Sequence, residues 1–87
     1  MNEETDRQKP IYEVKIIKID GENAIRRLCY LQHNYNPSPV EIERKIKKLF
    51  KYLEESYGSI ANVRLYSKGM SLQPIIEEAV YHLFGKK

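Results

Sequence analysis

The sequence predicts an α+β protein, a two-layer β-β-α-β-α sandwich in which a small mixed sheet carries two helices on one face. Three observations lead to this fold class. Apolar and polar residues alternate over 11–19, Asp20-Gly21 is typical of a tight hairpin turn, and Ser38 opens a capped helix. The order of these elements then decides where functional side chains are expected.

The first two strands are predicted to form a hairpin. Segment 11–19, IYEVKIIKI, is rich in β-branched residues and alternates, and after the turn at 20–23 the alternation resumes over 24–32. Residues 24–32 also fit a helix capped by Asp20, with one apolar side made of Ala24, Ile25, Leu28, Cys29 and Leu31. The turn chemistry favours the strand.

The first helix is expected over 39–57. Ser38 is predicted to cap it, Pro39 to take its first position and Glu41 to complete the capping box, while Gly58 offers a left-handed stop. These residues form the clearest helix signal in the chain.

The second half of the chain continues the alternation of strand and helix. Segment 60–67, IANVRLYS, alternates and predicts a third strand, and an apolar stripe predicts a second helix from about Ser71 to Phe84. Pro74 fits there because it falls in the first turn. Strands 24–32 and 60–67 should be parallel neighbours joined by a right-handed crossover.

The chain is short and slightly basic. Its 87 residues suit one domain, expected over 10–87, after a disordered polar tail at 1–9. No apolar run is long enough for a membrane span or a signal peptide, so a cytoplasmic protein without membrane contact is expected. The net charge of +3 slightly favours polyanionic partners.

Residues typical of catalysis or of metal sites are sparse. Cys29, His33 and His82 show no zinc-ligand spacing, and the unpaired Cys29 is interpreted as a small core residue. Neighbouring glutamates such as Glu54 and Glu55 diverge on a helix, and no glycine-rich nucleotide-binding motif occurs. The sequence therefore predicts no enzyme, no cofactor and no metal.

Basic residues crowd the middle of the first helix. Their simplest interpretation is a solvated face that forms the pairs Glu41–Lys45, Glu43–Lys47 and Lys51–Glu55. A cluster joined in space by further basic residues would instead favour binding to phosphates. The members of this helix cluster are Arg44, Lys45, Lys47, Lys48 and Lys51.

A second polar set is predicted at one edge of the sheet. Loop 32–37, QHNYNP, and the corner Lys68-Gly69 would both leave the C-terminal ends of parallel strands and enter helix N-termini, where an anion is stabilised. An Arg and a Tyr on the third strand can contact phosphates and bases. The predicted nucleic-acid-binding residues are Arg26, His33, Asn34, Tyr35, Lys45, Arg64, Tyr66, Lys68 and Gly69.

The run VRLYSKGMSLQPIIEEAVYHL resembles the strand-turn-helix segment of the Alba family of archaeal chromatin and RNA-binding proteins and their eukaryotic relatives in ribonuclease P. The resemblance covers roughly residues 24 to 84 and is best over 63–80. The matching positions are Leu65, Ser67, Lys68, Gly69, Ser71, Leu72, Ile76 and Ala79.

The chain also departs from that family. Its loop QHNYNP lacks the usual lysines, and no C-terminal β-hairpin follows the second helix. A related two-layer arrangement occurs in the C-terminal domain of the third bacterial translation initiation factor. The resemblance implies a dimeric module without catalysis that binds DNA or RNA by charge and shape.

The competing interpretation is a protein-interaction or assembly subunit. Three strands with helices on one face would leave the other face open, to be covered by a second copy or by another protein. A homodimer or heterodimer is therefore expected in either case.

Overall fold

The structure is a computed structural model that describes residues 11–85, and it is built from helices. In chain order they are α2 (Ile11–Leu28), the π-helix η1 (Cys29–His33), α3 (Pro39–Tyr57), α4 (Ile60–Ser67) and α5 (Gln73–Phe84). Over these residues there is no strand. The predicted α+β sandwich is therefore wrong, and the predicted tail at 1–9 lies outside the described residues.

The predicted hairpin is a single long helix in the structure. The buried residues of α2 are Glu13, Ile17, Gly21, Ala24 and Ile25. Each is three or four residues from another member of the set, which is the spacing of one helix face. The alternative interpretation, a helix over the residues that follow Asp20, correctly predicted that these residues are helical. Asp20 is not its cap, however, because it lies in the middle of α2.

Gly21 allows α2 and α3 to cross closely. A Cβ atom built at this position would lie 2.6 Å from Leu49 Cδ2 and 3.2 Å from Ile46 Cδ1, both on α3. The glycine that suggested a turn therefore serves the packing of two helices, where the absence of a side chain lets the backbones approach.

The start and the end of α3 are as predicted. Ser38 is extended and its Oγ accepts a hydrogen bond from the Glu41 N–H at 3.2 Å, with Pro39 in the first helical position. Gly58 ends the helix with a φ of 89°, in the left-handed region that glycine adopts readily.

The predicted third strand is the short helix α4. Its buried residues are Ile60, Val63 and Ser67, spaced three and four apart. A strand would place Leu65 on the same apolar face as Ala61 and Val63, but Leu65 is 72% exposed. The Ser59 hydroxyl caps α4 by accepting from the Asn62 N–H at 3.3 Å. The predicted second helix is present as α5, with Pro74 in its first turn.

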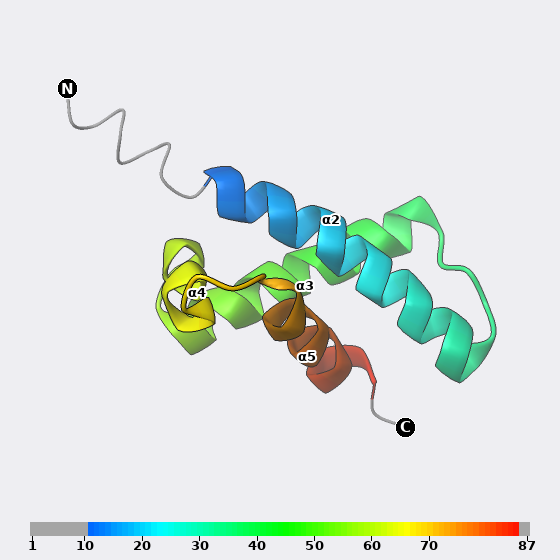
Figure 1. Cartoon of the computed structure of the whole chain (residues 1–87). Coiled ribbons are helices and arrows are strands. Elements are labelled where there is room, and N and C mark those ends of the chain that lie inside the picture. Colours follow the sequence, from blue (N-terminus) through cyan, green and yellow to red (C-terminus); the bar gives the residue numbers. More distant parts are fainter. Residues whose placement is uncertain (1–10, 86–87) are drawn as a thin grey trace.

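The helices surround one core to which α2, α3, α4 and α5 all contribute. Figure 1 shows α2 crossing α3, with α5 beside both. α4 lies at the C-terminal end of α3, and the loop that follows η1 lies at its N-terminal end. No described helix is long and apolar enough to span a membrane.

Candidate nucleic-acid interface

The structure separates the predicted site residues into two groups. One group surrounds the loop before α3, and the other lies on α4 and the turn after it, so the length of α3 divides them (Figure 1). Nineteen residues of helix span about 28 Å. The single rim expected from parallel strands does not exist. The loop group is Arg26, His33, Asn34, Tyr35 and Lys45, and the α4 group is Arg64, Tyr66, Lys68 and Gly69.

Arg26 holds the loop rather than pointing freely into solvent. Its Nη1 donates to Asn36 Oδ1 at 3.1 Å and its Nη2 pairs with Glu22 Oε2 at 2.9 Å. His33 ends η1, and Asn34 adopts a left-handed conformation with φ 58° while its N–H donates to the Tyr30 carbonyl at 3.0 Å. The left-handed Asn34 thus ends the π-helix and begins the loop that leads to α3.

Tyr35 and Lys45 are joined through Glu41. The Tyr35 hydroxyl donates to the Glu41 carboxylate, and Lys45 Nζ lies 3.9 Å from the same carboxylate. The hydrogen bond to Glu41 raises the pKa of Tyr35 well above its usual value, and the Cys29 thiol adds to this effect. Cys29 itself is buried, as predicted.

The residues on α4 are engaged in packing between helices. Arg64 Nε pairs with the buried carboxylate of Glu13, and its guanidinium lies 4.7 Å from the centroid of the Tyr12 ring. The hydrogen bond to Glu13 raises the pKa of Arg64. Tyr66 packs edge-on against Tyr57, with ring centroids 4.8 Å apart.

The corner Lys68-Gly69 ends α4 and does not begin α5. Both residues are left-handed, with φ 57° and 80°, and the Lys68 N–H donates to the Leu65 carbonyl at 3.3 Å. α5 begins only at Gln73, whose N–H donates a hydrogen bond to the Ser71 hydroxyl oxygen at 3.0 Å. A phosphate contact at Lys68 would therefore not share the N-terminus of α5.

The basic residues of α3 are better placed to contact a polyanion than the two predicted groups are. Ile42, Ile46, Leu49 and Leu53 of α3 are buried, and at 3.6 residues per turn four basic side chains fall within roughly 100° on the opposite side. We call this set the outward face of α3; its members are Arg44, Lys47, Lys48 and Lys51, all exposed.

Carboxylates flank the outward face at Glu43, Glu54 and Glu55, but in the described part of the chain they form no ion pair with its members. Of the three ion pairs expected along α3, only Glu41–Lys45 is present, at 3.9 Å, and Lys45 lies beside the outward face rather than on it. No ion pair joins the outward face to a carboxylate among residues 11–85. The expected pairing of Lys47 and Lys51 with glutamates is therefore not formed.

A groove borders the outward face where α3 meets the end of α5. Its volume is about 470 Å³, and Lys45 Nζ lies 4.5 Å from the centroid of the Phe84 ring. The basic residues of this groove were noted in the sequence, but its apolar part was not predicted, because Leu83 was expected on the buried stripe of the second helix and Phe84 only as its last residue. The groove is lined by Glu41, Arg44, Lys45, Lys48, Leu83 and Phe84.

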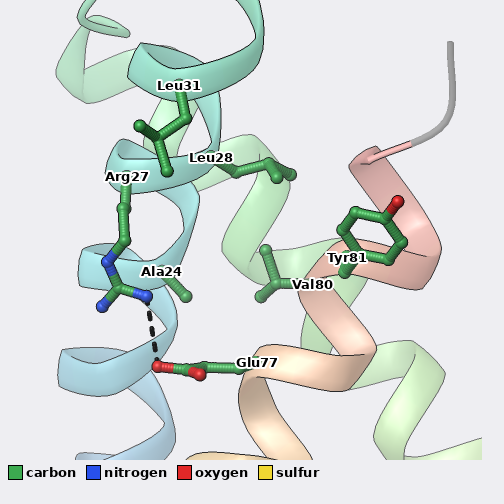
Figure 2. A pocket seen from close by; sticks show the side chains of 7 residues that line it. All are labelled: Ala24, Arg27, Leu28, Leu31, Glu77, Val80 and Tyr81. Atoms are coloured by element: carbon green, nitrogen blue, oxygen red, sulfur yellow. Dashed lines mark hydrogen bonds and ion pairs between the residues drawn. The ribbon is translucent and has the colours of Figure 1, made fainter.

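A second groove, between α2 and α5, is more apolar and smaller, at about 220 Å³. Figure 2 shows Leu31, Leu28, Val80 and Tyr81 around it, with the ion pair Arg27–Glu77 at one end, where the side chains are 3.1 Å apart. Leu31 is 69% exposed. The open sheet face that suggested a dimer is absent from residues 11–85, so an association of two copies stays a prediction without that support.

Comparison with models of known protein families, with curated proteins and with solved structures found no match. Residues 63–80, which carried the resemblance to the Alba family, form the last five residues of α4, a turn and most of α5. The strand-turn-helix arrangement that the resemblance implied is therefore wrong for this segment.

Proposed function

We propose that this chain is a non-catalytic DNA- or RNA-binding protein that contacts the phosphate backbone through the outward face of α3. The observation that carries this proposal is the clustering of Arg44, Lys47, Lys48 and Lys51 opposite the buried stripe, without carboxylate partners among the described residues. Closely spaced cations release counterions when they meet a polyanion, which favours binding. A cytoplasmic location stays the expectation for such a protein.

The other helical candidate for a nucleic-acid contact is less suitable. α4 and α5 are joined by a turn that contains Gly69, as in helix-turn-helix proteins, where the second helix enters the major groove. However, α5 contains no Lys or Arg, and Glu77 and Glu78 lie in its middle. A helix of this charge repels phosphates, which leaves α3 as the better contact element.

The salt dependence of binding tests the proposal. Four phosphate contacts predict a log-log slope of about −3.6 on duplex and about −2.8 on single strands. Lys51→Gln should weaken binding and flatten the slope by about 0.7 to 0.9, as one lost contact requires. Fluorescence anisotropy with generic DNA and RNA over a range of salt concentrations measures both quantities.

Lys15→Gln is the matched control, since it removes the same charge from an exposed position on α2. It should leave the slope unchanged. Equal effects of the two substitutions would contradict a specific role for the outward face. Binding to polyglutamate or to anionic vesicles as tight as to nucleic acid would reject nucleic acid as the partner class.

A further inference from the structure

The groove between α3 and the end of α5 combines cations with an aromatic ring. Arg44, Lys45 and Lys48 line it together with Phe84, and its volume of about 470 Å³ falls within the range of roughly 300 to 1,000 Å³ that is typical of ligand sites. Two of these cations, Arg44 and Lys48, also belong to the outward face of α3. The groove is therefore a continuation of the proposed phosphate-binding surface.

Charge in the groove favours an anion. Its single carboxylate, Glu41, already accepts the Tyr35 hydroxyl and lies 3.9 Å from Lys45 Nζ. Arg44 and Lys48 are one helical turn apart and pair with no carboxylate among residues 11–85. A phosphate between them would gain two charge-assisted contacts.

The apolar side of the groove offers a ring for stacking. Phe84 packs against the core. Lys45 Nζ also contacts the ring, at 4.5 Å from its centroid. That contact marks a ring face within reach of the groove. Stacking of a nucleobase on an aromatic ring is worth more than an exposed contact between a cation and a ring. A base can thus take the place of the Lys45 ammonium on the Phe84 ring. The flexible side chain of Lys45 can then move its ammonium to a phosphate.

We propose that this groove selects single-stranded nucleic acid, with one base stacked on Phe84 and its flanking phosphates on Arg44 and Lys48. The inference rests on the proposed function of the outward face. It requires a single strand because bases in a duplex are stacked on each other and paired, so their faces cannot reach a protein ring.

The chain supplies a matched pair of variants, because it has two phenylalanines, both half-buried and both packed against the core. Phe84 lines the groove and Phe50 does not. Anisotropy titrations with one labelled oligonucleotide, single-stranded or annealed to its complement, compare the two forms. Phe84→Leu should weaken single-strand binding about tenfold and change duplex binding by less than about twofold. Phe50→Leu should change neither.

Equal binding of single strand and duplex by the parent, or the same effect from both phenylalanine variants, would overturn the inference while the proposed function stands. Absence of binding to either form would overturn both. Should Phe84→Leu fail to fold, ultraviolet cross-linking of the parent to a single strand with 5-iodouracil replaces it. An adduct on Phe84 is expected, and adducts confined to other residues would refute the stacking contact.

Discussion

At the scale of single residues, both ends of α3 depend on groups that are close together in the sequence, such as the Ser38 hydroxyl and the Glu41 N–H. Ser38, Pro39 and Gly58 occupy their predicted positions at the ends of α3, because a cap needs only a side chain and the N–H groups of the next turn. The pair Glu41–Lys45 was predicted and is present at 3.9 Å, but the hydrogen bond from the Tyr35 hydroxyl to the same carboxylate was not predicted. That hydrogen bond depends on how the loop folds back, which no local pattern encodes.

The hydrogen bond from Tyr35 to Glu41 gives a prediction about pH. Tyr35→Phe removes the donor and should lower the urea midpoint of unfolding at neutral pH. The pKa of Tyr35 is raised in the folded state, chiefly by this hydrogen bond, so its contribution is fully present below the unfolded value of about 10. It is lost as the pH rises through the folded pKa.

The difference in stability between parent and Tyr35→Phe should therefore be constant from pH 6 to about 9 and shrink above about 10. Tyr81→Phe is the control, since Tyr81 is 59% exposed and its hydroxyl forms no side-chain hydrogen bond among the described residues. It should have little effect at any pH. A difference that grows in alkali would contradict the hydrogen bond.

At the scale of elements, α3 was predictable from its capping Ser38 and Pro39, and α5 from its apolar stripe with Pro74 in the first turn. The segments predicted as three strands are helical instead. Segments 11–19 and 60–67 show both an alternating and a helical pattern, because short apolar runs satisfy either period. Tertiary packing decided between them. Ile17 and Val63 are fully buried when their segments are helical, and Gly21 provides the crossing point that a hairpin interpretation used as a turn.

The role of Gly21 can be tested by adding one methyl group. In an exposed helix, glycine to alanine gains about 1 kcal/mol from helix propensity. At Gly21 the new Cβ would lie 2.6 Å from the end of Leu49, which is fully buried, and overpacking of this kind costs about 1 to 3 kcal/mol. Gly21→Ala should therefore destabilise the protein by about 1 kcal/mol, measured by urea unfolding.

Asn23→Ala provides the comparison for that experiment. Asn23 is an exposed residue of the same helix, so alanine there gains helix propensity without a clash and should stabilise by a few tenths of a kcal/mol. A hairpin over these residues would also be destabilised by Gly21→Ala, because its turn needs glycine, but it would gain no stability from Asn23→Ala, so the Asn23 substitution distinguishes the two structures. Stabilisation by both substitutions would show that α2 and α3 do not cross closely at this point.

At the scale of the whole molecule, the sequence predicted the charge of the proposed interface but not its position. The basic residues of α3 can be read directly from the sequence, and the amphipathic helix that carries them was correctly predicted. Its continuation into the groove at Phe84 required α5 to pack against α3, a contact between segments about 40 residues apart. The rim proposed from parallel strands failed because its geometry came entirely from the sheet.

Net charge and charge placement can be separated by moving two lysines. Lys47→Gln and Lys51→Gln remove half of the outward face, and Asn23→Lys with Met70→Lys restore the net charge of +3 at two exposed positions on other segments. Attraction that depends only on net charge would be unchanged by this exchange. Contacts at the outward face would be lost, so the fourfold variant should bind nucleic acid more weakly. Its salt slope should be smaller by about 1.4 to 1.8. Circular dichroism of both proteins confirms equal helix content, and a parent-like affinity and slope in the variant would show that the outward face of α3 is not the binding surface.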